Sequence, residues 1–121
     1  MKNIYVFTGN RAEYGLLKYL IQKIDNSNFF NLKLIVGGSH SSKEYGNTIN
    51  EIKNDNLKPF KIFSLPIHKG SEISMASLTY ISMGKSINIL KESECELIFI
   101  LGDRYESFAM ASAAYLLGIP I

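Results

Sequence analysis

This chain of 121 residues has no tryptophan, three prolines and one cysteine. It also has few of the features that are typical of secreted and membrane proteins. The single thiol, Cys95, cannot form an intramolecular disulfide, and no cysteine or histidine pair has the spacing of a zinc site. No apolar run approaches the roughly 20 residues that span a membrane, and Gly9 and Arg11 interrupt the first apolar stretch too early for a signal peptide. We therefore expect a cytoplasmic protein with neither disulfides nor a structural metal.

An excess of charge of one sign is also missing. The chain has thirteen Lys and Arg and eleven Asp and Glu, which gives a net charge of +2, and the basic residues are scattered along the sequence. This pattern excludes a nucleic-acid-binding face and a membrane-binding patch and favours a small-molecule ligand. With 46% hydrophobic and 20% charged residues and no linker, residues 1–121 are expected to form one domain.

Short apolar runs alternate with helical periodicity along the whole chain. The runs predict strands at 2–8, 32–36, 60–65 and 97–101, with Ile119-Pro120-Ile121 beginning a fifth. The periodic segments predict helices from Arg11 to about Asp25, Tyr45 to about Asn56, Ile73 to about Lys91, and Tyr105 to Leu117. Such alternation is typical of an open, mainly parallel, Rossmann-like α/β sheet with helices on both faces.

Two of the predicted helices carry further expectations. The long helix from Ile73 has a stripe that should face a core, formed by Ala76, Tyr80, Met83, Ile87 and Leu90. The helix 105–117 is rich in alanine and large apolar residues, so we expect it to be largely buried. A helix this apolar needs more sheet to cover it, and we therefore expect an incomplete domain and a partial chain.

The turn after the first strand, Thr8 to Gly15, is the first candidate site. It combines Gly9 and other backbone amides with Arg11 and Glu13 at a helix start, where amides and the helix dipole favour an anion. Alternatively, Glu13 only complements the helix dipole and Arg11 is solvated. The turn is neither a GxGxxG dinucleotide fingerprint nor a Walker loop, so we predict neither NAD binding nor ATP hydrolysis.

The second candidate is the turn Leu101-Gly102-Asp103-Arg104-Tyr105-Glu106, which follows the most apolar strand. Asp103 could act as a general base or orient a substrate hydroxyl, because ligands bind beyond the carboxyl ends of the strands in open α/β sheets. It could equally be a helix N-cap, with Arg104 and Glu106 an ordinary exposed charge pair.

A third turn, Gly37-Gly38-Ser39-His40, is followed by Tyr45-Gly46-Asn47-Thr48 at the same predicted edge of the sheet. His40 could donate a hydrogen bond to a ligand there, or be structural or solvated.

The three turns, taken in order, resemble a known family. NRAEYG, GGSH followed by YGNT, and LGDRYE are similar to the corresponding segments of the hydrolysing UDP-N-acetylglucosamine 2-epimerases that feed sialic acid synthesis, including bacterial capsule enzymes. The resemblance implies a GT-B arrangement of two Rossmann-like domains with the active site between them. This chain would supply the first domain, and the second would be absent from it.

The resemblance also implies a reaction and a set of site residues. UDP-GlcNAc would lose UDP by elimination, and the 2-acetamidoglucal formed would take up water to give N-acetylmannosamine, without a redox cofactor. Asp103 would be an acid/base carboxylate. The substrate-binding residues would be Arg11, Arg104, Gly9, His40 and Glu13, although Glu13 and Glu106 could only shape their turns and the role of His40 is not fixed.

Three other interpretations stay open. The enzyme could act on a diacetamido sugar nucleotide, as in legionaminic acid synthesis, or the chain could be the acceptor half of a GT-B glycosyltransferase. It could also be a binding or oligomerisation domain without catalysis. The resemblance further implies a homodimer or higher homo-oligomer formed through this domain, with the long helix from Ile73 as the candidate surface.

Overall fold

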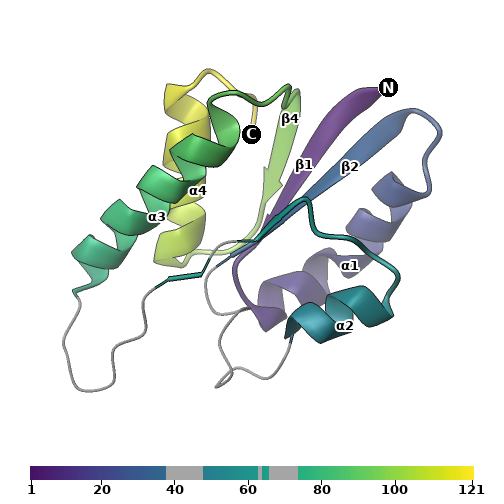
Figure 1. Ribbon diagram of the computed structural model, residues 1–121, viewed down its shortest axis with the longest axis horizontal. Coiled ribbons are helices and arrows are strands. Elements are labelled where there is room, and N and C mark those ends of the chain that lie inside the picture. Colours follow the sequence, from purple (N-terminus) through teal and green to yellow (C-terminus); the bar gives the residue numbers. More distant parts are fainter. Residues whose placement is uncertain (38–47, 63, 66–73) are drawn as a thin grey trace.

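A computed structural model of the chain describes residues 1–37, 48–62, 64–65 and 74–121. Strands and helices alternate within these residues (Figure 1). The strands are β1 Lys2–Thr8, β2 Phe30–Val36, β3 Lys61–Ile62 and β4 Leu97–Ile100. The helices are α1 Arg11–Asp25, α2 Thr48–Asn54, α3 Met75–Leu90 and α4 Tyr105–Leu116. No helix of this part of the chain is both long and apolar enough to cross a membrane.

The four strands form one parallel sheet in the order β3-β2-β1-β4. Helices α1 and α2 lie on one face, and α3 and α4 lie on the other (Figure 1). Thr8 pairs with Val36, and Phe7 pairs with Ile100, so β1, β2 and β4 end at the same edge of the sheet. The predicted fold class is therefore confirmed, and the turns after β1 and β4 lie side by side.

Residues 119–121 lie along the outer side of β4. The Ile98 N–H donates a hydrogen bond to the Pro120 carbonyl at 3.0 Å, although the segment forms no regular strand. The predicted fifth strand is thus represented by a single hydrogen bond.

Two apolar clusters hold the helices on the sheet. Alternate residues of β1 point to opposite faces, as the strand geometry requires. Ile4 and Val6 pack with α1, α2 and β2 in a cluster that includes Tyr14, Ile21, Leu34 and Ile52. Tyr5 and Phe7 pack with α3, α4 and β4 in a cluster that includes Leu90, Ile98, Met110 and Ala113. The central strand is therefore buried on both faces and fixes the turn at its end.

The predicted buried stripe of the long helix is wrong at its amino-terminal end. Ala76 is exposed and Tyr80 is 80% exposed, whereas the buried side chains of α3 are Ser82, Ser86 and Leu90. Helix α3 packs along α4, and the two serines leave room for close approach of the two helices. The Ser86 hydroxyl is satisfied within the helix, because it donates to the Ser82 carbonyl at 2.7 Å.

The expected burial of the last helix is also only partly correct, and the strand next to it is half-buried. Phe108, Tyr115 and Leu116 of α4 are exposed, and Phe99 of β4 is 36% exposed. The reason is that α1 packs against β1 and β2 rather than β4. One face of β4 and one face of α4 are therefore partly exposed.

Several predicted boundaries shift. The second strand begins at Phe30 rather than Leu32, and the third is only Lys61–Ile62, although the Phe60 N–H already donates to the Leu34 carbonyl. The start predicted for the second helix, residues 45–47, lies outside the described residues. That helix ends at Asn54, and Asn56 then adopts a positive φ of 60°, which asparagine tolerates.

Candidate functional site

The turn after β1 is built around an inward-pointing carboxylate. Asn10 is the N-cap of α1, and its Oδ1 accepts a hydrogen bond from the Glu13 N–H at 2.9 Å. The Glu13 carboxylate accepts in return from the Gly9 N–H at 2.9 Å and from Asn10 Nδ2 at 2.8 Å. The arrangement is similar to a capping box with asparagine as the cap, except that Glu13 accepts from the N–H of Gly9, the residue before the cap. Glu13 is only 5% exposed, so it does more than complement the helix dipole from the surface.

Gly102 brings the turn after β4 against the same carboxylate. Its φ is +111°, a conformation that side chains rarely adopt, and a Cβ placed there would lie 2.8 Å from Glu13 Oε2. The two predicted turns therefore touch through Glu13 and Gly102. A glycine is needed at position 102 for both its backbone angle and the space that its missing side chain leaves.

Asp103 follows Gly102 and faces outward. The N-cap of α4 is Arg104, without a side-chain capping hydrogen bond, so the interpretation of Asp103 as the helix cap is wrong. Asp103 is exposed, and within the described part of the chain no hydrogen bond or ion pair occupies its carboxylate. The group is therefore available to a ligand.

Arg104 is anchored to a buried glutamate. Its Nε donates to Glu106 Oε2 at 3.2 Å, and the guanidinium lies 5.8 Å from the centroid of the Tyr105 ring. Glu106 is 1% exposed, whereas the Arg104 side chain is 42% exposed. The alternative of an ordinary exposed charge pair is therefore wrong. The second oxygen, Oε1, is buried without a hydrogen-bond partner in the described structure.

The buried charge of Glu106 affects the ionisation of Glu13. Burial raises the pKa of Glu13, the Gly9 N–H lowers it, and the nearby Glu106 charge raises it further. Arg104 and Asn10 partly offset this increase. The positive charge of Arg104 thus acts on two buried carboxylates, because it binds Glu106 and lowers the pKa of Glu13.

Arg11, Asp103 and Arg104 meet at one hollow. The cavity, of about 600 Å³, is lined by both turns together with Leu16 and Leu101. Asp103 and Arg104 also line an adjoining hollow of about 580 Å³, with Met75, Tyr105 and Phe108. A carboxylate and two cationic side chains are therefore gathered at the carboxyl edge of the sheet, where α/β proteins bind ligands.

The remaining predicted residues have different surroundings. The Arg11 side chain is 72% exposed and forms an ion pair with Glu51 of α2, with Nε and Oε2 3.5 Å apart. The Gly9 N–H donates to Glu13, so this amide is committed within the turn. His40 lies outside the described residues. Among the described residues, no group of three or more His, Cys, Asp or Glu could hold a metal ion.

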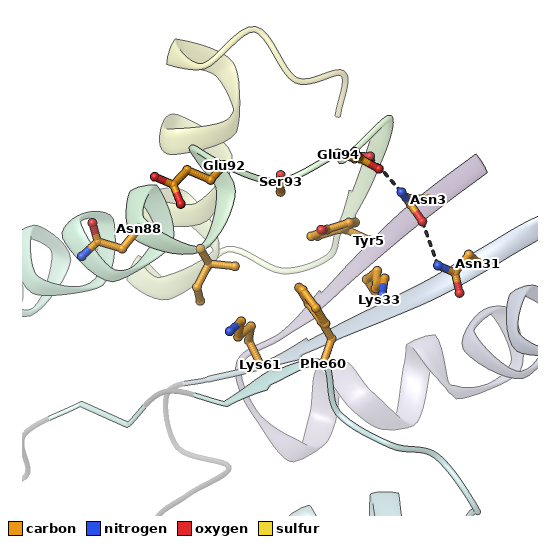
Figure 2. A pocket seen from close by; sticks show the side chains of 11 residues that line it. Asn3, Tyr5, Asn31, Lys33, Phe60, Lys61, Asn88, Glu92, Ser93 and Glu94 are labelled. Atoms are coloured by element: carbon orange, nitrogen blue, oxygen red, sulfur yellow. Dashed lines mark hydrogen bonds between the residues drawn. The ribbon is translucent and has the colours of Figure 1, made fainter. Parts of the chain in front are cut away.

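A larger hollow lies at the opposite, amino-terminal end of β1 and contains none of the predicted residues. It encloses about 680 Å³, and Figure 2 shows side chains from β1, β2, β3 and the end of α3 around it. Asn31 Nδ2 donates to Asn3 Oδ1, and Asn3 Nδ2 donates to the Glu94 carbonyl (Figure 2). Lys33 and Lys61 place their Nζ atoms 4.6 and 5.5 Å from the Phe60 ring centroid. These side chains stabilise one another, and the acid and cations of the predicted site lie elsewhere.

The comparisons with known proteins agree with this geometry. The family model described as UDP-N-acetylglucosamine 2-epimerase matches residues 22–121, and the chain belongs to that family. The polysialic acid biosynthesis protein P7 of Escherichia coli is 32% identical over 121 residues, which are 100% of this chain and 31% of that protein. The hydrolysing UDP-N,N'-diacetylbacillosamine 2-epimerase of Legionella pneumophila is 34% identical over 99% of this chain and 32% of its own length.

A solved structure shows the same fold. The UDP-GlcNAc 2-epimerase of Neisseria meningitidis bound to UDP-GlcNAc superposes with a TM-score of 0.77 at 22% identity, over 99% of this chain and 31% of that one. The fold is thus that of the amino-terminal part of a GT-B protein. The chain spans about a third of the length of the relatives it matches.

Proposed function

We propose that this chain is the amino-terminal domain of a hydrolysing UDP-GlcNAc 2-epimerase of the cytoplasm, which converts UDP-GlcNAc and water to N-acetylmannosamine and UDP for sialic acid or related nonulosonate synthesis. The observation that carries the proposal is the hollow shared by Arg11 and Asp103 at the carboxyl edge of the sheet. Membership of the 2-epimerase family supports the reaction class and disfavours the glycosyltransferase alternative.

The exposed groups fit the elimination step. Asp103 would accept the C2 proton as the C1–O bond to UDP breaks, which leaves a C1–C2 double bond in 2-acetamidoglucal. Arg11 and Arg104 would stabilise the negative charge that develops on the departing diphosphate. Water would then add its oxygen to C1, and a proton would return to C2 from the opposite face. Asp103 is suited to the first step because no internal contact of the described structure holds its carboxylate.

The second domain would complete the site. Because the relatives are about three times as long as the matched segment, we expect a second GT-B domain to supply most of the contacts to UDP and further carboxylates. Gly9, Glu13 and His40 belong to this proposal through their family positions only. We expect the 121-residue chain by itself to have no epimerase activity.

Replacing Asp103 tests the proposal directly. Asp103→Asn in the two-domain protein keeps the side-chain shape and removes the basicity. General acid–base catalysis contributes about 100- to 10,000-fold, so kcat should fall by that order while KM changes little. The assay is release of N-acetylmannosamine from UDP-GlcNAc. Undiminished turnover would remove Asp103 from the reaction.

A second candidate substrate is a diacetamido sugar nucleotide, which the Legionella relative favours because its name specifies UDP-N,N'-diacetylbacillosamine. The reaction chemistry at C1 and C2 would be the same. Comparison of kcat/KM for the two nucleotide sugars with the two-domain protein separates these candidates. Turnover of neither sugar would support the alternative of a binding or oligomerisation domain.

We also propose that the protein forms a homodimer or higher homo-oligomer through α3. Met75 and Tyr80 are exposed apolar residues of this helix. A shallow hollow of about 510 Å³ runs along the same helix and is lined by Tyr80, Ile81, Met83 and Ile87, among others. Exposed apolar surface of this kind is typical of protein–protein contacts.

A further inference from the structure

We infer that Glu13 and Glu106 are positioning residues that hold the Asp103 turn and Arg104 at the rim of the hollow without touching the substrate. The inference rests on the proposed function, because it assigns Asp103 and Arg104 to the reaction. It changes the expected role of Glu13 from substrate contact to support of the neighbouring turn.

The contacts of Glu13 show how it acts. Its carboxylate binds the Gly9 N–H and Asn10 Nδ2 on one side and fills the space in front of Gly102 on the other. Asp103 follows Gly102 directly. The position of the Asp103 backbone thus depends on a carboxylate that belongs to the turn after β1.

Glu106 acts on the other side of Asp103. It accepts a hydrogen bond from Arg104 Nε. This contact fixes the direction of the side chain, and Arg104 lines both hollows. Burial makes the glutamate a rigid anchor, since it is 1% exposed in the first turn of α4.

The two anchors are also adjacent. A Cβ on Gly9 would lie 3.4 Å from Glu13 Oε1 and 3.5 Å from the Glu106 Cβ. Both carboxylates therefore pack around the same turn beneath the hollow. Two like charges in such a place are costly. Glu13 offsets this cost by accepting from the Gly9 N–H and Asn10 Nδ2, and Glu106 offsets it by binding Arg104.

Kinetics of Glu13→Gln and Glu106→Gln in the two-domain protein test the inference, with Glu92→Gln at an exposed position of the chain as the matched control. Misplacement of a reacting group by about 1 Å can cost about 100-fold, so we expect losses of about 10- to 100-fold in kcat/KM. Glu13→Gln should lower kcat and leave KM within about twofold, because Asp103 acts in the chemical step. Glu106→Gln should also raise KM, because Arg104 contacts the diphosphate.

A double-mutant cycle decides whether Glu106 acts through Arg104. The effect of Glu106→Gln should disappear in the Arg104→Gln background, because the residue that it orients is gone. An equal loss in both backgrounds, or folded single variants with kcat/KM within twofold of the parent, would overturn the inference. If Glu106→Gln does not fold, Arg104→Lys removes the Nε contact from the exposed side, and unchanged kinetics of that variant would overturn it as well.

The parent protein separates this inference from the proposed function. If the parent protein forms no product from UDP-GlcNAc and none from the diacetamido sugar nucleotide, the proposed function is contradicted. The placement of Arg104 is then measured by calorimetric binding of UDP, for which Glu106→Gln should weaken affinity about tenfold if one charge-assisted contact is lost. Equal affinity of parent and variant would overturn the positioning role alone.

Discussion

The carboxylate of Glu13 occupies the space that a side chain at position 102 would need, since a Cβ on Gly102 would lie 2.8 Å from Glu13 Oε2. The turns after β1 and β4 are thus matched to each other. Stability and site geometry depend on the same contact, and it can be probed from either residue.

Gly102→Ala should destabilise the chain by about 1–3 kcal/mol, because it adds a Cβ at a positive φ and drives it into a carboxylate. Urea unfolding measures the change. The control is Gly15→Ala in α1, where a Cβ meets nothing within 4 Å. That variant should gain about 0.5–1 kcal/mol from helix propensity. Equal stability of the two alanine variants would contradict the proposed crowding at Gly102.

Glu13→Gln should change how stability depends on pH. The folded-state pKa of Glu13 is raised above the ordinary value of a glutamate, chiefly by burial. Protonation therefore stabilises the fold, and this contribution is complete below the unfolded-state pKa and is lost as pH rises through the folded-state pKa.

Unfolding free energies of the parent and of Glu13→Gln between pH 4 and pH 7 test this sign. The parent should gain stability relative to the variant as the pH falls toward the unfolded-state pKa of about 4.3. Asp55 titrates alike in both proteins and cancels in the difference. Parallel profiles would show that Glu13 does not titrate with the predicted shift.

Tyr14→Phe should remove the hydrogen bond that links α1 to the turn after α2. The buried Tyr14 hydroxyl donates to Asp55 Oδ2 at 2.6 Å, and Lys18 Nζ lies 3.0 Å from the same oxygen. A hydrogen bond to a charged group contributes about 1.5–3 kcal/mol, so a loss of that order is expected near pH 7.

The effect of Tyr14→Phe should also depend on pH in one direction. The hydrogen bond from the Tyr14 hydroxyl, followed by that from Lys18, lowers the pKa of Asp55 below the ordinary value of an aspartate. Stability from this contact is therefore present above the unfolded-state pKa and is lost as pH falls through the folded-state pKa. Tyr19→Phe, at an exposed position of α1, is the control and should change stability by no more than about 0.5 kcal/mol.

Tyr80→Lys should weaken self-association of the two-domain protein if α3 forms the interface. A buried interface tyrosine contributes about 2 kcal/mol or more, so the variant should dissociate at concentrations where the parent is associated. Light scattering over a dilution series measures this. Tyr19→Lys, an exposed tyrosine on α1, should leave the association unchanged. Equal effects of the two variants would place the interface elsewhere.

The edge of the sheet at which the candidate site lies could be predicted from the sequence, because this prediction depends only on the order and direction of the strands. Once β1 and β4 are recognised as parallel strands of one sheet, Arg11 and Asp103 must follow strand ends at the same edge. The prediction needed no information about side-chain contacts.

The inward direction of Glu13 and the burial of Glu106 could not be predicted in the same way. A glutamate in the first turn of a helix has the same local pattern whether it faces water or a neighbouring turn. The difference at Glu13 comes from Gly102, which is distant in sequence. A spacing of NxxE after one strand, paired with the glycine of a GDR sequence after another, is the signal that could have suggested it.

The buried face of α3 was misjudged for a related reason. Apolar residues occur on several sides of this helix, so their spacing does not select one face. Packing along α4 selects the face that carries Ser82 and Ser86, because small side chains allow the two helices to approach.

The contact between α3 and α4 at Ser82 and Ser86 also affects the positions of Asp103 and Arg104. Helix α4 starts at Tyr105, immediately after Asp103 and Arg104, so the spacing between α3 and α4 helps to set where those two side chains lie. A bulkier residue at position 86 would push α4 away from its neighbour and shift the rim with it. A substitution at this helix interface would therefore alter the hollow that Asp103 and Arg104 line without replacing any residue of its lining.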